Sequence, residues 1–226
     1  MNRPSHGGSR LHAIVPVNLL DKSKTRLSPL LTRIDRERLT LAMLTDVLRA
    51  LEKERAISDV TIVSADPKIL PIARRYGAKV SWERNRRGLN RALKTGIENV
   101  ESKAKGAVLI VHADLPLLTP RDIKALIASS EKYEVTIAPC KEGTGTNALL
   151  LKRPNAMPLS FGRGSFRKHV SAARKEKLRY RVVRFEGIEF DVDEPRDLRI
   201  LMRLPGKGAT QCFLEKLSLE RQSKAI

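Results

Sequence analysis

The sequence feature that most constrains the fold is an unbroken apolar run, Ala107–Val111, which ends at the turn His112-Ala-Asp-Leu-Pro116. Such a run is typical of a strand that is buried on both faces of a parallel sheet. Because ligands of an open α/β sheet bind beyond the carboxyl ends of its strands, Asp114 lies where a functional group is expected. A carboxylate there suits a divalent metal over substrate phosphates. It also suits the capping of a helix that begins near Thr119, so the run alone leaves both interpretations open.

Around this run, apolar segments alternate with amphipathic segments up to Pro139. The predicted strands are 11–17, 59–65, 78–82, 107–111 and 134–139, and the predicted helices between them are 33–54, 68–76, 88–100 and 119–133. This alternation predicts a mostly parallel sheet with helices on both faces. After Pro139 the pattern changes. The segments predicted there are strands 148–151 and 178–185, a helix over 166–176 and another helix from Pro195.

Length and composition limit the classes of protein to consider. A chain of 226 residues fits one α/β domain, which we expect over 11–204, between a mobile tail at 1–10 and a basic C-terminal segment at 205–226. The two cysteines form no metal or redox motif, which favours a reducing compartment such as the cytoplasm. No apolar run is long enough to span a membrane, and the N-terminus lacks the apolar centre of a signal peptide.

The net charge of +19 predicts attraction to polyanions without choosing among them. A nucleic-acid-binding protein is therefore an alternative. The sequence argues against it, because only 4% of the residues are aromatic and no nucleic-acid-binding motif is present. A solvated basic surface without a partner is a further alternative.

A cationic loop follows the first predicted strand. Lys22, Lys24 and Arg26 alternate along it, and they would share one face if the loop were extended. The loop contains neither a P-loop motif nor a dinucleotide fingerprint. At the carboxyl edge of a sheet it suits a triphosphate, although charge runs are more often simply solvated.

Small-residue loops occur at three further places. Residues 141–147 and 161–166 are rich in Gly, Thr and Ser, and Gly88 and Asn90 begin a predicted helix beside Arg86 and Arg87. Glycine lets backbone amides approach a ligand closely, and a helix N-terminus attracts anions. Plain turns and an ordinary helix cap at Asn90 are the alternatives.

A second pair of carboxylates precedes the helix from Pro195. Asp191 and Asp193 would share one face of an extended segment and could complete a metal site with Asp114, whereas Asp193 could instead cap the helix. His112 and His169 are further possible ligands, but lone histidines are more often structural.

Six motifs occur in an order that resembles the 2-phospho-L-lactate guanylyltransferase family of the nucleotidyltransferase superfamily, over about residues 11–204. They are Lys22-Ser-Lys-Thr-Arg-Leu27, Gly88-Leu-Asn90, Ala113-Asp-Leu-Pro116, Gly145-Thr-Asn-Ala-Leu-Leu150, Phe161-Gly-Arg-Gly-Ser-Phe166 and Phe190-Asp-Val-Asp193. The fourth and fifth motifs are the specific part of the resemblance, and the Asp-Leu-Pro and Asp-x-Asp motifs are shared more widely.

The resemblance implies a fold and a reaction. The fold would be a Rossmann-like three-layer α/β/α nucleotidyltransferase (glycosyltransferase-A-type) fold with a mostly parallel central sheet, assembled as a homodimer. The reaction would join GTP and 2-phospho-L-lactate into lactyl-2-diphospho-5'-guanosine with release of pyrophosphate, in coenzyme F420 biosynthesis. Phosphoenolpyruvate and 3-phosphoglycerate are alternative acceptors. A molybdopterin or sugar-phosphate nucleotidyltransferase is the second enzymatic alternative.

The resemblance and the residue chemistry together imply roles for each motif. Lys24 and Asp114 would be the catalytic residues, with Mg²⁺ held by Asp114 and by Asp191 or Asp193. The expected nucleotide- and substrate-binding residues are Lys22, Arg26, Gly88, Asn90, Thr146, Asn147, Gly162, Gly164 and Ser165. The sequence departs from the family pattern at two positions. Asn18 stands where many relatives have lysine, and His112 stands where some have an acidic residue.

Overall fold

The computed structural model describes residues 11–83, 89–101 and 106–223. Its strands are β1 (Leu11–Val17), β2 (Ile57–Ser64), β3 (Lys79–Trp82), β4 (Ala107–Val111), β5 (Val135–Pro139), β6 (Thr146–Leu151) and β7 (Tyr180–Val182). Its α-helices are α1 (Arg33–Glu52), α2 (Leu70–Arg75), α3 (Leu89–Glu101), α4 (Pro120–Ser129), α5 (Ser165–Lys175), α6 (Glu186–Glu189), α7 (Pro195–Arg203) and α8 (Ala209–Ser223). Short 3-10 turns are η1 (Leu20–Lys22), η2 (Thr25–Leu27) and η3 (Pro67–Ile69). Among the described helices, none has the length and apolar character needed to cross a membrane.

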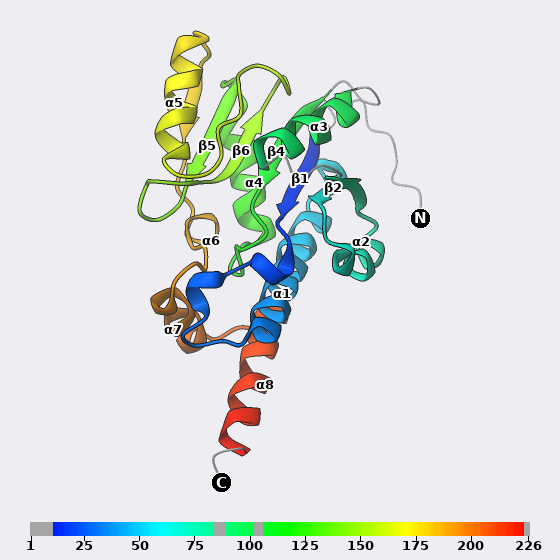
Figure 1. Cartoon of the computed structure of the whole chain (residues 1–226). Coiled ribbons are helices and arrows are strands. Elements are labelled where there is room, and N and C mark those ends of the chain that lie inside the picture. The colour runs from blue at the N-terminus through cyan, green and yellow to red at the C-terminus, as the bar shows by residue number, and fades with distance from the viewer. Residues whose placement is uncertain (1–10, 84–88, 102–105, 224–226) are drawn as a thin grey trace.

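The strands form one sheet in the order β3-β2-β1-β4-β6-β5-β7 (Figure 1). β1 pairs in parallel with β2 on one side and with β4 on the other. β6 runs antiparallel to both β4 and β5, so the sheet is mixed but mostly parallel, as predicted. The strand order reverses its direction of growth at β1, between β2 and β4. Ligands of open α/β sheets bind at such a switch point, which here places the loops after β1 and β4 side by side.

Two apolar layers cover the sheet. Side chains of α1, α2 and α4 pack on one face together with Ala13 and Val15 of β1. Side chains of α3 and α5 pack on the other face, where Ile14 of β1 points. The alternation of neighbouring β1 residues between two cores explains why the predicted strands read as continuous apolar runs. The chain therefore has the three-layer architecture that the sequence pattern predicted.

The C-terminal segment forms a helix that the sequence pattern did not predict. Leu214 and Leu217 of α8 are buried in a third apolar cluster with α1 and α7. The carboxylate of Asp46 on α1 accepts hydrogen bonds from the Ala209 and Thr210 amides at 2.7 and 2.8 Å, which satisfies free amides at the start of α8. Because this cap comes from 163 residues earlier in the chain, local periodicity could not reveal it.

Two predicted elements are longer in the sequence pattern than in the structure. The helix predicted over 119–133 ends at Ser129, where the hydroxyl of Ser130 donates to the Ile127 carbonyl and closes the last turn. The strand predicted over 178–185 is limited to Tyr180–Val182, because the chain then leaves the sheet edge and enters the short helix α6.

Candidate active site

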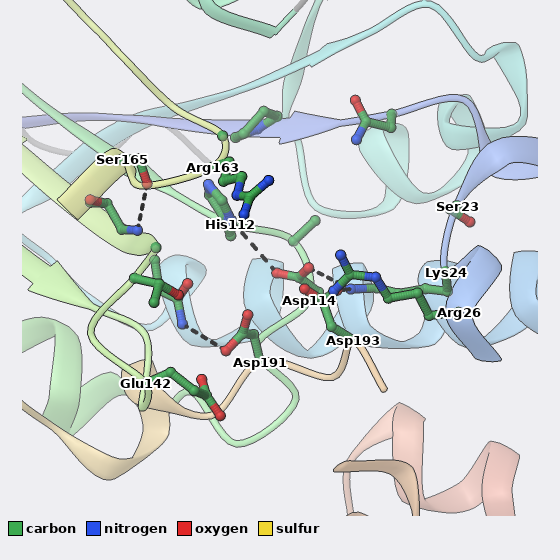
Figure 2. A pocket seen from close by; sticks show the side chains of 18 of the residues that line it. Ser23, Lys24, Arg26, His112, Asp114, Glu142, Arg163, Ser165, Asp191 and Asp193 are labelled. Atoms are coloured by element: carbon green, nitrogen blue, oxygen red, sulfur yellow. Dashed lines mark hydrogen bonds and ion pairs between the residues drawn. The ribbon is translucent and has the colours of Figure 1, made fainter. Parts of the chain in front are cut away.

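A cavity of about 1140 Å³ lies at the carboxyl ends of β1 and β4. Most of the residues predicted to act in binding or catalysis line it. They are Lys22, Lys24, Arg26, Asp114, Thr146, Asn147, Gly162, Gly164, Ser165, Asp191 and Asp193. The structure therefore gathers loops that are far apart in the sequence around one site (Figure 2). Gly88 lies outside the described residues.

The centre of the cavity is an ion-paired cluster on Lys24. The Lys24 ammonium lies 2.5 Å from Asp114 Oδ2 and 2.8 Å from Asp193 Oδ1, and only 8% of its side chain is exposed. Burial opposes its charge, but the two carboxylates outweigh burial and raise the pKa of Lys24. Burial likewise opposes the ionisation of Asp114, whereas the Lys24 ammonium brings the pKa of that carboxyl below its ordinary value. Both groups are therefore charged at neutral pH.

The loop that carries Lys24 is not extended, so the condition under which its cations would alternate along one face is not met, although all three line the cavity. Residues 20–27 form the turns η1 and η2, separated by Lys24 in the left-handed backbone region at φ 49°. Side-chain packing causes this path, because Leu20 and Leu27 are buried on either side of the cations. Lys24 is the cation that reaches the cluster, whereas Arg26 lies 3.7 Å from Glu194 at the rim.

Asp191 lies next to this cluster without a cation of its own among the ion pairs of the described residues. Its Oδ1 accepts a hydrogen bond from the Asn147 amide at 3.3 Å, and that amide also donates to the Ile188 carbonyl at 2.8 Å. Burial and the nearby charge of Asp114 raise the pKa of Asp191 to about 6, which the Asn147 hydrogen bond only partly offsets. A bound cation would remove this penalty.

The second carboxylate oxygen of Asp114 lacks a hydrogen-bond partner among the described residues. Asp114 Oδ1 is buried and has no hydrogen-bond partner among the described residues, and His112 Nδ1 lies 3.9 Å away. Burial lowers the pKa of His112, so this ring supplies no positive charge at neutral pH. A hard divalent cation such as Mg²⁺ prefers carboxylate oxygens. The Asp114 oxygen without a hydrogen-bond partner among the described residues and the raised pKa of Asp191 therefore both fit a metal at this end of the cavity.

The opposite wall of the cavity is the loop 161–165 together with the start of α5. Gly162 and Gly164 have φ values of +108° and +71°, a region that residues with a Cβ rarely adopt. Ser165 Oγ accepts the Thr146 amide at 2.9 Å, which joins this loop to β6. The Thr146 amide is therefore paired within the protein.

Asn90 contacts the loop 161–165 through its side-chain amide. Its side-chain amide donates to the Phe161 carbonyl at 3.1 Å and accepts from the Phe161 amide at 2.7 Å. Asn90 is not among the residues that line the cavity. The structure therefore shows Asn90 as an anchor of the loop 161–165, and a contact with the base or ribose stays a prediction.

Sequence reasoning missed several residues that line the cavity. Arg163 and Arg167 extend from the glycine loop and α5 with exposed side chains, and Thr144 and Glu142 come from the loop before β6. The two arginines add positive charge to the wall opposite the carboxylates. Their positions on either side of Ser165, with Arg163 inside the fifth motif and Arg167 directly after it, were the available signal, because a helix start with flanking arginines favours an anion. Asn18, one of the departures from the family pattern, is exposed and also lines the cavity.

The geometry combines a carboxylate end that suits a metal with a basic, glycine-rich end that suits an anion. Lys24, fixed at the switch point of the sheet, is ion-paired to two carboxylates of the first end. Such an arrangement can hold a metal-bound polyphosphate and a second anion in one cavity, as a phosphoryl- or nucleotidyl-transfer site requires.

Comparison with known proteins gives consistent matches over nearly the whole chain. A family model described as "Guanylyl transferase CofC like" matches residues 11–225. The chain is 39% identical to a phosphoenolpyruvate guanylyltransferase of Sphaerobacter thermophilus over 198 residues, covering 88% of this chain and 95% of that protein. It is 33% identical to a 2-phospho-L-lactate guanylyltransferase of Methanocaldococcus jannaschii over 217 residues, covering 96% and 93%.

A solved structure supports the fold. A nucleotide-diphospho-sugar transferase of Desulfovibrio desulfuricans G20, described by its title as putative, superposes with a TM-score of 0.74 at 17% identity. The match covers 95% of this chain and 98% of that chain. At this identity the likeness concerns the fold alone.

Proposed function

The chain belongs to the CofC-like guanylyltransferase family of coenzyme F420 biosynthesis, and we propose that it transfers GMP from GTP to a phosphorylated three-carbon carboxylate. The observation that carries this proposal is the Lys24–Asp114–Asp193 cluster, in which one Asp114 oxygen has no hydrogen-bond partner in the described part of the chain, facing the glycine loop across one cavity. The relatives supply the nucleotide and the acceptor class, since their names specify guanylyl transfer to phosphoenolpyruvate or to 2-phospho-L-lactate.

The proposed reaction needs no nucleophile from the protein. A phosphate oxygen of the acceptor attacks the α-phosphorus of GTP, the bond between the α-phosphorus and the bridging oxygen breaks, and pyrophosphate leaves with the bond's electron pair. The acceptor phosphate is already ionised at neutral pH, so no general base is required. The protein's contribution is to position two anions in line and to neutralise their charge.

Four residues take part in the charge neutralisation in this proposal. Asp114 and Asp191 would hold Mg²⁺, which would supply Lewis-acid stabilisation of the α-phosphate. Asp193 stays paired with Lys24, whose ammonium contacts the departing phosphates. We choose Asp191 over Asp193 as the metal ligand because Asp193 is paired with Lys24, whereas Asp191 has no ion pair among the described residues.

The acceptor fits the basic wall of the cavity. Arg163, Arg167 and the backbone of Gly162–Ser165 surround a space that suits the phosphate and carboxylate of one small molecule. Phosphoenolpyruvate is our first candidate, because a relative named for it is 39% identical to this chain. 2-Phospho-L-lactate is the second candidate. It carries a phosphate and a carboxylate on C2, as phosphoenolpyruvate does, and a relative named for it is 33% identical to this chain. The two differ chiefly in the planar or tetrahedral geometry of C2.

Pyrophosphate release tests the proposal. Purified protein with Mg²⁺ is incubated with each of the four nucleoside triphosphates and with phosphoenolpyruvate, 2-phospho-L-lactate or 3-phosphoglycerate. We expect release with GTP and one of the first two acceptors only. Release with another nucleotide would contradict guanylyl specificity, and no release with any pair would contradict the activity itself.

A further inference from the structure

A buried histidine behind the basic wall connects two of its parts. His169 of α5 is fully buried, and its ring lies edge-on to Phe161 at a centroid distance of 4.8 Å. Its Nε2 accepts the Ser160 amide at 3.1 Å, and its Nδ1 lies 2.9 Å from Thr146 Oγ1. The ring therefore bridges the segment before the glycine loop and the first residue of β6.

These two contacts define the tautomer of the ring. A backbone amide can only donate, so Nε2 must carry its lone pair toward Ser160. Burial, with smaller effects of His112 and Lys168, lowers the pKa of His169 to about 4, so the ring is neutral at physiological pH. The single ring proton therefore lies on Nδ1 and is donated to Thr146 Oγ1.

The tautomer in turn orients the Thr146 hydroxyl. Once Oγ1 accepts from His169, the hydroxyl proton is directed to a third group. Thr146 is 1% exposed and lines the cavity beside Ser165, whose Oγ already accepts the Thr146 amide at 2.9 Å. An anion held against this wall would be the natural acceptor of that proton, because a hydrogen bond to a charged partner is stronger than one to a neutral partner.

We propose that His169 is a positioning residue for the acceptor: it orients the Thr146 hydroxyl as a donor into the anion site and holds the glycine loop through Ser160. The inference rests on the proposed function, because it assigns the acceptor rather than GTP to this wall. Substitution of His169 should therefore change the KM for the acceptor and not the KM for GTP, and it should act through Thr146.

Two substitutions separate the contacts of the ring. In His169→Gln the side-chain oxygen can still accept the Ser160 amide, while the donation to Thr146 is lost. In His169→Asn the side-chain nitrogen lies near the place of Nδ1 and can still donate to Thr146. We expect His169→Gln to raise the acceptor KM about tenfold with the KM for GTP within twofold of wild type, and His169→Asn to restore most of the loss.

A double-mutant cycle with Thr146→Val tests the route through the hydroxyl. We expect Thr146→Val to raise the acceptor KM about tenfold, and His169→Gln to have no further effect in that background. Thr146→Ser, which keeps the hydroxyl, serves as the matched control. Independent, multiplying effects of the two substitutions, or an equal rise of both KM values, would overturn the proposal and leave His169 a purely structural residue.

A spectroscopic measurement covers the case in which a variant does not fold. The ¹⁵N chemical shifts of His169 in the wild-type protein report the ring tautomer directly. Protonation at Nδ1 is expected, and protonation at Nε2 would overturn the inference whatever the kinetics show. If the wild-type protein turns over and His169→Gln has the same kinetics, the inference alone is overturned. If the wild-type protein shows no turnover, the proposed function is overturned as well.

Discussion

The two ends of the cavity differ in how completely their polar groups are paired. At the basic end, Thr146 is held by hydrogen bonds to Ser165 and His169, and Asn90 fixes the loop by both polar atoms of its amide. At the acidic end, Asp114 Oδ1 has no partner among the described residues and Asp191 ionises against nearby negative charge.

This difference indicates two strategies of binding. The basic end is preorganised, so an anion meets donors that are already in place and little reorganisation is needed. At the acidic end, burial and nearby negative charge disfavour the ionised form of Asp191, and a divalent cation would relieve this cost. The metal-bound state of this end is therefore favoured over the metal-free state. Substitutions should therefore reduce catalysis most at the acidic end, and the predictions below test this contrast.

The largest effect is expected from Asp114→Asn. The amide removes the charge that faces both Lys24 and the proposed metal, so kcat should fall by more than about 10³-fold, on the order of 4 kcal/mol in the barrier. The measurement is pyrophosphate release at saturating substrates. Asp59→Asn, which alters an exposed carboxylate paired with Lys79, is the matched control. Activity within tenfold of wild type in Asp114→Asn would contradict the metal site.

Lys24→Met should lower kcat by about 10²- to 10³-fold, because the ammonium that faces the departing phosphates is lost while the aliphatic stem remains. Loss of this cation also leaves Asp114 and Asp193 without their shared partner, so calorimetry should show weaker binding of GTP. Lys132→Met, on an exposed turn, is the control for charge alone. Equal effects of the two variants would show that only general electrostatic attraction is involved.

A smaller effect, on stability rather than turnover, is expected at the basic end. His169 has a folded-state pKa of about 4 against an ordinary value of 6.5, so the unfolded chain binds the proton more readily between these values. Its contribution to stability is complete above about pH 6.5 and is lost as the pH falls toward 4. Between pH 7 and 4.5, wild type should lose about 2 kcal/mol more unfolding free energy than His169→Gln.

Urea unfolding at each pH measures this difference, and the other buried histidines titrate in both proteins and cancel. Parallel pH profiles of the two proteins would contradict a neutral, buried His169.

The smallest effect is expected from Asp191→Asn in metal-free buffer, where the substitution should increase the free energy of unfolding. The pKa of Asp191 is raised from 3.8 to about 6, so its ionisation destabilises the native state as the pH rises through this range. The full shift corresponds to about 3 kcal/mol at pH 7.5, but Asp191 is only half-buried and solvent screens its charge, so with chelator the amide should increase the unfolding free energy by about 1 kcal/mol. Addition of Mg²⁺ should stabilise wild type and not the variant. A variant that is less stable than wild type without metal would contradict the claim that ionised Asp191 destabilises the native state.

The sequence pattern predicted the sheet well because burial on two faces leaves a strong local signal. The apolar runs at Leu11–Val17 and Ala107–Val111 match β1 and β4 residue for residue. The motifs taken together also supplied most of the residues that line the cavity. The helix α8 was missed, since its cap comes from Asp46 and its apolar residues pack against distant helices.

The sequence by itself determined the strand positions, the family and the set of charged and small residues available to the site. These properties depend on local periodicity and on motifs that are contiguous in the chain. Only the tertiary structure decided which of these groups meet: Lys24 pairs with Asp114 and Asp193, Asn90 holds the glycine loop, and His169 contacts Thr146. The physical reason is that charge pairing and hydrogen-bond direction depend on distances across the fold, which residue spacing along the chain does not specify.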